Sequence, residues 1–255
     1  MRILLTNDDG IYAPGIVSLA KALSKEHQII VAAPNCEKSG FSHALTLSKP
    51  LKYAEVDYPN GIEAYSVDGM PADCVKFALL HIGKHYKPDL LISGINSGCN
   101  LGSDIMYSGT VSAAVDGAYM GIKSVAISRG EYGRRHSDEH MDEVAAFMAD
   151  NIQAIYEYHL PKYTILNINY PVAEPAGIAF TSMGVNIYDD GYYEDEKVAG
   201  HFWLRGKSVS FDPMPDTVDM LWSQKGYVTI TPIKLDRTDY DVLKNLPTAG
   251  FKLKI

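Results

Sequence analysis

Residues 3–33, ILLTNDDGIYAPGIVSLAKALSKEHQIIVAA, decide the fold of this chain. The stretch opens with the apolar run 3–5, passes through a polar turn at 6–10 and a helical pattern at 15–23, and closes with the apolar run 29–33. Short apolar runs bounded by turn residues are typical of buried strands, and the repeat between them has the spacing of an amphipathic helix. The stretch therefore predicts a strand, a loop, a helix and a second strand, in that order.

The same alternation continues through the middle of the chain. Residues 89–93 (DLLIS) and 124–128 (SVAIS) are two further candidates for buried strands, and they bracket a helical stretch at 110–119. An amphipathic helix is expected at 138–158 and another strand at 163–168. Buried strands that alternate with helices indicate an α/β fold with a mostly parallel sheet and helices on both of its faces.

The last third of the chain has a different character. This part is rich in Gly, Pro, Asp and Tyr, with strand-like pieces at 178–181 and 226–231. Such a composition favours hairpins over repeated strand and helix units. We therefore expect one domain spanning 1–255, with an α/β core at about 1–172 and a hairpin-rich extension at about 173–255 that serves in oligomerisation.

Composition and charge limit the class of protein. The chain has 255 residues, 46% of them hydrophobic and 21% charged, which is typical of a globular protein and unlike a disordered or fibrous one. The net charge is −8 and no basic block occurs, so we expect no nucleic-acid duplex as a partner. No apolar run approaches the roughly 20 residues of a membrane span and no secretory signal follows Met1, so a cytoplasmic location without membrane contact is expected. The three cysteines lack CxxC spacing, which argues against a disulfide framework and a thiolate zinc site.

Polar residues cluster where three of the predicted strands end. They form the loops at 6–10 (TNDDG), 34–40 and 93–98 (SGINSG). Ligands of open α/β sheets bind at the carboxyl ends of the strands, so these loops are expected to converge on one edge of the sheet. Asp8 and Asp9 in the first loop are adjacent carboxylates, and leaving both ionised is unfavourable unless a cation or strong donors compensate. A hard divalent cation such as Mg²⁺, which takes one or two protein carboxylates, is the simplest explanation.

Two oxygen-bearing side chains in the other loops strengthen the case for a metal. With Asp8 and Asp9, they make a four-ligand set of oxygens that suits Mg²⁺ or Mn²⁺; these further ligands are Ser39 and Asn96. The alternative is that the same residues only form turns, with Asp9 and Gly10 as a turn pair. Ser39 would then be a turn hydroxyl and Asn96 a left-handed turn residue. On the aspartates alone the turn is the stronger explanation, and the combination of three loops favours the metal site.

A candidate anion site lies at the start of the helix predicted over 110–119. Ser108, Gly109 and Thr110 stand at this start, and backbone N–H groups at a helix N-terminus attract anions. We expect these three residues, together with Asn96, to bind a substrate phosphate next to the metal. The alternative, that Ser108 or Thr110 only caps the helix, is equally consistent with the sequence.

Other catalytic arrangements fit less well. The motifs GxxxxGK[ST] and GxGxxG are absent from the expected places, which argues against NTP motors and dehydrogenases. Asp8 and Asp9 are consecutive and would point to opposite sides of an extended segment, so the covalent mechanism of phosphatases with a DxD loop is disfavoured. His43 lies four residues beyond Ser39 and is a candidate acid or base, although most isolated histidines are structural. Tyr107 is the tyrosine expected nearest to the phosphate site.

Joined in order, these segments resemble the SurE (survival protein E) family of 5'/3'-nucleotidases. The matching motifs run through nearly the whole chain and are ILLTNDDGIYAPGI (3–16), APNCEKSGFSHALTL (33–47), VDGMPADCVKFAL (67–79), PDLLISGINSGCNLGSDIMYSGTVSAA (88–114), LNINYP (166–171) and GYVTITP (226–232). The resemblance implies a Rossmann-like core, a C-terminal extension that exchanges between the subunits of a dimer, and a divalent cation. Carried over position by position, the metal ligands of the family fall on Asp8, Asp9, Ser39 and Asn96. Residues 189–205 depart from the family pattern, which leaves the substrate preference open.

The resemblance also implies an activity. It is the hydrolysis of nucleoside 5'- and 3'-monophosphates to nucleoside and inorganic phosphate by a homodimer or a dimer of dimers. We expect one Mg²⁺ or Mn²⁺ ion per subunit, with Asp8 and Asp9 as catalytic residues that orient or deprotonate a metal-activated water. Some members of the family also hydrolyse short polyphosphate, so the breadth of substrate stays open. Two rival hypotheses are a nucleotide-binding sensor that performs no chemistry and an α/β scaffold whose loop residues only form turns.

Overall fold

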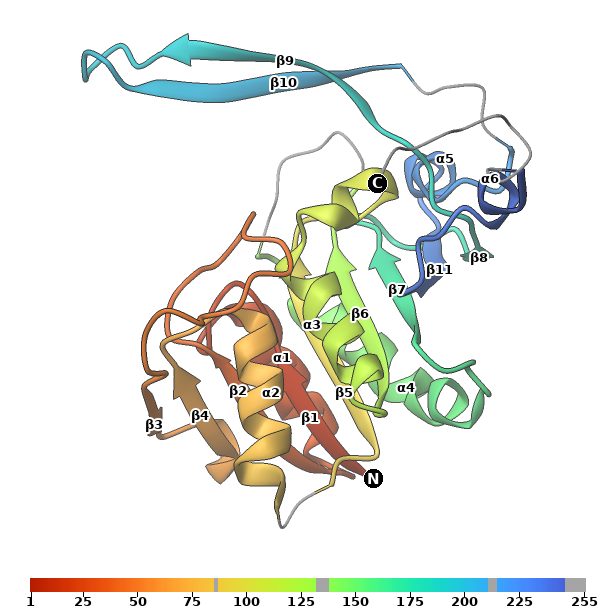
Figure 1. Cartoon of the computed structure of the whole chain (residues 1–255). Coiled ribbons are helices and arrows are strands. Elements are labelled where there is room, and N and C mark those ends of the chain that lie inside the picture. The colour runs from red at the N-terminus through yellow and green to blue at the C-terminus, as the bar shows by residue number, and fades with distance from the viewer. Residues whose placement is uncertain (85–86, 132–137, 211–214, 246–255) are drawn as a thin grey trace.

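A nine-stranded sheet forms the centre of the computed structural model, which describes residues 1–84, 87–131, 138–210 and 215–245 (Figure 1). Its strands lie in the order β3-β4-β2-β1-β5-β6-β7-β11-β8. Their bounds are β1 Arg2–Thr6, β2 Gln28–Pro34, β3 Tyr53–Glu55, β4 Glu63–Val67, β5 Leu90–Ser97, β6 Lys123–Arg129, β7 Thr164–Tyr170, β8 Ile178–Phe180 and β11 Val228–Lys234.

Helices connect these strands. They are α1 Pro14–Leu23, α2 Pro71–Leu80, α3 Gly109–Tyr119, α4 Met141–Glu157, α5 Asp219–Gln224 and α6 Tyr240–Asn245, with the short 3-10 helices η1 Pro59–Gly61, η2 Ile82–Lys84 and η3 Gly102–Met106. The neighbouring strands from β4 through β2, β1, β5 and β6 to β7 all run parallel. The predicted α/β fold with a mostly parallel sheet is therefore confirmed.

Alternation along the strands divides the core into two layers. On β1, Ile3 and Leu5 belong to the apolar cluster formed with α1 and α4, whereas Leu4 belongs to the cluster formed with α2 and α3. Successive side chains of a strand point to opposite faces, so a strand that is apolar at every position must be covered on both. Figure 1 shows the two helix pairs on opposite sides of the sheet, as the sequence predicts.

The strand order creates a switch point beside β1. The chain passes from β1 to β2 and β4 on one side and later places β5 on the other side of β1. The connections that leave β1 and β5 therefore diverge at the carboxyl ends of two adjacent parallel strands. Such a position is where open α/β sheets bind their ligands.

The C-terminal part extends the sheet and also forms a separate arm. β11 pairs antiparallel with β7 and parallel with β8, so the strand-like pieces at 178–181 and 226–231 join the main sheet instead of forming a hairpin with each other. β9 (Ile187–Glu194) and β10 (Phe202–Ser210) form an antiparallel pair that projects away from the sheet (Figure 1). This arm agrees with the hairpin-rich extension expected from the composition. The division into a core and an extension near residue 172 stays a prediction.

Some elements differ from those expected. α4 begins at Met141 instead of residue 138, because the preceding His140 has a left-handed backbone with φ of 58°. The helix α2 was not expected, since its buried positions are filled mainly by small residues such as Ala72 and Cys74, which give little periodic contrast. Within the described ranges, no helix is long and apolar enough to cross a membrane.

Truncation of Ile92 tests the contribution of the central strands to stability. Ile92 lies on β5, is fully buried and belongs to the cluster formed with α1 and α4. We expect Ile92→Ala to lower the free energy of unfolding in urea by about 2 to 5 kcal/mol, because the change removes buried methyl groups and leaves a cavity. Leu80→Ala at the exposed end of α2 is the control and should change this free energy by about 0.5 kcal/mol or less. Equal losses in the two variants would contradict the placement of Ile92 in the core.

Candidate active site

A pocket of about 560 Å³ opens at the switch point, at the carboxyl ends of β1 and β5. Its walls come from the loops after β1, β2 and β5 and from the start of α3. The structure therefore brings together five of the residues predicted to form the site: Asp8, Asp9, Ser39, Asn96 and Ser108. Loops that are far apart in the sequence converge at one edge of the sheet, as expected for parallel strands.

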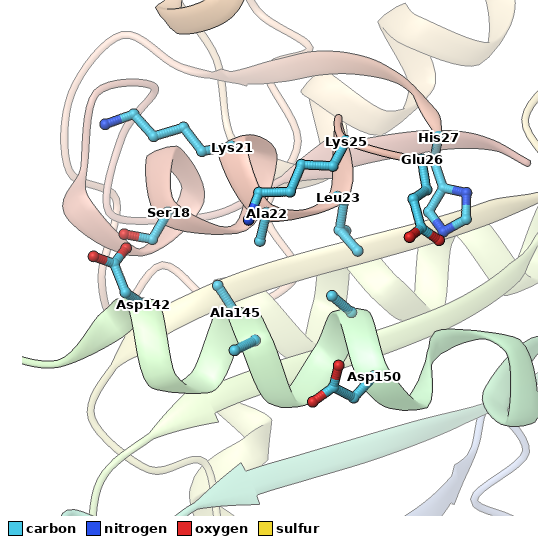
Figure 2. A pocket seen from close by; sticks show the side chains of 12 residues that line it. Ser18, Lys21, Ala22, Leu23, Lys25, Glu26, His27, Asp142, Ala145 and Asp150 are labelled. Carbon is cyan, nitrogen blue, oxygen red and sulfur yellow. The ribbon is translucent and has the colours of Figure 1, made fainter.

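A second cavity, of about 360 Å³, lies between α1 and α4 on one face of the sheet (Figure 2). It is lined by small residues such as Ala22 and Ala145 and by charges of both signs, including Lys21, Asp142 and Asp150. This cavity reaches Glu26 and His27, directly before the start of β2, and the predicted site residues do not line it. We therefore assign the chemistry to the pocket at the switch point.

Asp8 is held against the N-terminus of α3. Its side chain is 3% exposed, and both of its oxygens accept hydrogen bonds from one residue. The backbone N–H of Thr110 donates to Oδ2 at 3.1 Å, and the Thr110 hydroxyl donates to Oδ1 at 2.5 Å. Burial raises the pKa of the Asp8 carboxyl above its usual value, and the hydrogen bonds from Thr110 oppose that shift. The carboxylate is thus fixed in one orientation.

Gly109 allows this close approach of helix and carboxylate. A Cβ at this position would lie 2.8 Å from both Cβ and Oδ2 of Asp8. Any larger residue would displace either the start of α3 or the carboxylate. The glycine of the Ser108-Gly109-Thr110 motif is therefore explained by its contact with Asp8.

Asn7 shapes the loop that carries the two aspartates. Its side chain donates to the carbonyl of Gly10 at 2.9 Å and accepts from the backbone N–H of the same residue at 3.3 Å. Gly10 has a φ of 107°, a conformation that favours glycine. The backbone carbonyl of Asp8 accepts from the N–H of Lys38 at 2.7 Å, which ties the loop to the one after β2. This role of Asn7 was not predicted from the sequence.

Asp9 has fewer compensating contacts than its neighbour. Its Oδ2 accepts one hydrogen bond, from the backbone N–H of Ser97 at 3.2 Å. Burial raises the pKa of Asp9 to about 7, and the negative charge of Asp8 is the second cause. Two adjacent carboxylates in such a pocket are unfavourable when both are ionised, and a divalent cation would offset both the burial and the repulsion.

The other oxygen donors of the pocket fit a hard cation. Asn96 donates its Nδ2 to the carbonyl of Gly98 at 2.8 Å, which leaves Oδ1 as the atom available to a ligand. Ser39 is exposed in the loop after β2 and lines the same pocket. The described part of the chain has no group of three or more His, Cys, Asp or Glu side chains that could hold a metal. A site here would therefore combine two carboxylates with a hydroxyl and an amide oxygen, which suits Mg²⁺ or Mn²⁺.

The N-terminus of α3 is already engaged by an anion of the chain itself. Ser108 is the N-cap, and its Oγ accepts from the N–H of Val111 at 3.1 Å. Thr110 is fully buried and directs both its N–H and its hydroxyl to Asp8. Of the three residues expected to bind phosphate here, Ser108 lines the pocket, whereas Gly109 and Thr110 contact Asp8.

A buried amide network supports the loop after β5. The backbone N–H of Asn100 donates to Oδ1 of Asn169 at 2.7 Å, and its side chain donates to the hydroxyl of Ser128 at 2.8 Å. The side-chain amides of Asn167 and Asn169 both donate to the carbonyl of Asn100. This network was not predicted from the sequence, although polar residues at alternate positions of the LNINY strand were a signal that could have revealed it.

Some residues that line the pocket were not predicted to do so, and one candidate catalytic residue lies outside it. Its walls also carry the acidic side chains Glu37, Asp104 and Asp138. Tyr107 lines the pocket, close to Ser108 as expected from the sequence. His43 is not among the lining residues, and its contact is with a carboxylate of α3.

The raised pKa of Asp9 predicts how stability depends on pH when no cation is bound. Between about pH 4 and pH 7 the folded state holds a proton on Asp9 that the unfolded state has released. This group therefore lowers the free energy of unfolding as pH rises through that window. In EDTA, Asp9→Asn should be more stable than the wild type at pH 8, and the difference between the two proteins should grow from pH 4 to pH 7. A difference that stays constant over this range in urea titrations would contradict the prediction.

The chain is similar over its whole length to known proteins. Residues 3–190 match the family described as survival protein SurE. A protein of Carboxydothermus hydrogenoformans named 5'-nucleotidase SurE is 42% identical, over 97% of this chain and 96% of the relative. A protein of the same name from Thermoanaerobacter sp. is 38% identical over 100% of both chains. The crystal structure of the SurE protein from Aquifex aeolicus has a TM-score of 0.82 and 36% identity, over 98% of this chain and 100% of that one. This chain belongs to the SurE family.

Proposed function

We propose that the chain is a nucleotidase that hydrolyses nucleoside 5'- and 3'-monophosphates with one Mg²⁺ or Mn²⁺ ion in the pocket at the switch point. The observation that carries the proposal is the pair of adjacent carboxylates in this pocket, accompanied by a hydroxyl and an amide oxygen. The residues that would hold the ion are Asp8, Asp9, Ser39 and Asn96. The relatives named 5'-nucleotidase SurE support the choice of substrate.

The two aspartates would have different tasks in the reaction. When bound, the cation supplies Lewis-acid stabilisation of a phosphoryl oxygen and lowers the pKa of a bound water. Asp8 has both oxygens hydrogen-bonded to Thr110, so it holds one orientation throughout. Asp9 has a hydrogen bond from Ser97 and retains free lone pairs, so we assign to it the task of orienting the attacking water and accepting its proton.

The remaining walls of the pocket suit a nucleotide. Ser108 and Asn96 line it at the place where a phosphate would lie against the cation. Gly109 and Thr110 would act on the phosphate indirectly, by holding Asp8 in place. The Tyr107 ring is 70% exposed at the same pocket, so it is open to stack on a base. A volume of about 560 Å³ lies within the range typical of sites for small ligands.

Phosphate release from nucleotides tests the proposed activity. We expect the wild type to release inorganic phosphate from 5'-AMP and 3'-AMP in Mg²⁺ or Mn²⁺ and to lose this activity in EDTA. Asp8→Asn should lower kcat on the order of 100-fold or more, because it removes a charged ligand from a buried position. Asp150→Asn, an exposed aspartate on α4, is the matched control and should leave kcat unchanged.

The panel of substrates also separates the rival hypotheses. Tight binding of AMP without phosphate release would identify a sensor instead of an enzyme. No effect of the cation on the thermal midpoint would indicate that the loop residues only form turns. Short polyphosphate in the same panel measures the range of substrates that the chain hydrolyses.

The cytoplasmic location expected from the sequence stays a prediction.

We propose further that the chain associates through its β9 and β10 arm. The arm carries exposed apolar side chains on both strands, including Tyr192 at 73% and Leu204 at 59% exposure, which lie opposite each other in the pair. Exposed apolar patches of this kind mark surfaces that bind other proteins. A homodimer, or a dimer of dimers, would cover them.

The mass in solution tests this association. We expect light scattering to give a dimeric or tetrameric mass for the wild type. The double variant Tyr192→Ser with Leu204→Ser should shift the mass towards the monomer, because it removes two apolar side chains that association would bury. Leu80→Ser, at an equally exposed leucine of α2, is the control. A monomeric wild type would refute the proposal.

A further inference from the structure

We propose that His43 and Asp116 are positioning residues. Their contact fixes the position of the loop that carries Ser39 relative to α3, the helix that holds Asp8. The proposal rests on the proposed function in one respect, namely that Ser39 is a ligand of the metal. It adds a role for a histidine and a buried carboxylate that lie outside the pocket.

The loop at 35–52 depends on contacts with other elements. It links β2 to β3 and contains no helix or strand, yet Ser39 at its turn lines the pocket. The backbone N–H of Ser42 donates to the carbonyl of Tyr107 at 3.1 Å, at the start of α3. The backbone N–H of Thr46 donates to the carboxylate of Asp73 on α2 at 3.0 and 3.2 Å. Between these two anchors lies His43.

The contact of His43 is with a buried carboxylate in the last turn of α3. His43 Nε2 lies 3.0 Å from Asp116 Oδ2, and the Asp116 side chain is 6% exposed. This oxygen has no well-directed hydrogen bond within the described chain, so the contact with His43 is a close polar approach. On the other side, Lys76 Nζ of α2 lies 2.7 Å from Asp116 Oδ1. Burial raises the pKa of Asp116, but the contacts with His43 and Lys76 outweigh it and lower the pKa, so the carboxylate stays ionised.

Lys76 and His43 serve Asp116 in different ways. Lys76 joins two helices that are already packed against each other, and its charge alone would balance that of Asp116. His43 comes from the loop instead, four residues from Ser39. Neutralising the Asp116 carboxylate therefore does not explain why His43 lies beside it. Anchoring the loop to α3 does explain this contact.

The same helix thus holds two sides of the site. Thr110 in the first turn of α3 fixes Asp8, and Asp116 lies six residues later, about 9 Å further along the helix axis. Asp8 follows β1 and Ser39 follows β2, and the hydrogen bond from the Lys38 N–H to the Asp8 carbonyl joins the two loops at one point. α3 provides a second, common attachment, through Thr110 for one loop and through Asp116 for the other.

Three variants distinguish positioning from plain stabilisation. His43→Ala should weaken Mn²⁺ binding, measured by EPR titration, about 10-fold or more, and should speed hydrogen exchange of the amides in 37–47. Its thermal midpoint should shift by less than about 3 °C. His43→Gln, whose amide can make a polar contact with Asp116 in place of the imidazole, should restore most of the Mn²⁺ affinity. Lys76→Met is the matched control: it removes the other partner of Asp116 and should lower the midpoint, yet leave Mn²⁺ affinity within about twofold.

The outcomes separate this proposal from the proposed function. If His43→Ala keeps wild-type Mn²⁺ affinity and loop exchange, or if Lys76→Met weakens Mn²⁺ binding as much, the positioning role is wrong. A variant His43→Gln with normal Mn²⁺ binding but a large loss of kcat would make His43 an acid or base and would also overturn it. If the wild type binds no Mn²⁺, the metal in the proposed function fails, and the exchange of residues 37–47 alone decides on the positioning role.

Discussion

The carboxylate of Asp8, buried at the N-terminus of α3, is the interaction on which the rest of the site depends. A buried carboxylate is unfavourable unless donors replace its water, and Thr110 supplies two of them at the positive end of the helix dipole. Gly109 lets the helix come within contact of the side chain. The end of β1 and the start of α3 are therefore one unit, and a displacement of either one moves the other.

The topology of the sheet determines where this unit can be. β1 lies between β2 and β5, so the loop after β1 is flanked by the loops after both neighbours. A Cβ on Gly15 would lie 2.0 Å from the carbonyl oxygen of Ile95, so α1 also starts in close contact with the end of β5. The pocket is thus enclosed by two helix starts and three loops whose backbones are in mutual contact. Gly15 is required because the backbone of β5 approaches it closely, and Gly109 is required because the Asp8 side chain packs directly against it.

Local sequence patterns were sufficient to predict the central strands of the sheet. The runs at 3–5, 29–33 and 90–92 are apolar at every position, and burial on both faces of a parallel sheet requires that pattern. Partners across the chain could not be predicted in the same way. The pairing of β8 with β11 is set by tertiary packing, and the contact of His43 with Asp116 joins residues 73 positions apart. The four oxygen donors were predictable because each lies at or after the end of a strand that could be predicted, with Asn96 among the last two residues of β5.

The two adjacent aspartates were indistinguishable in the sequence, and the fold makes them different. Asp8 is directed at the helix and has both oxygens engaged by Thr110, whereas Asp9 is directed at the end of β5 and has one hydrogen bond from Ser97. Both residues lie in the bend that follows β1, which ends at Thr6. The asymmetry therefore comes from the walls that the two side chains face, the start of α3 for Asp8 and the end of β5 for Asp9. Asp9 is therefore the carboxylate with free lone pairs, and it lies in the pocket where an attacking water would approach the phosphate.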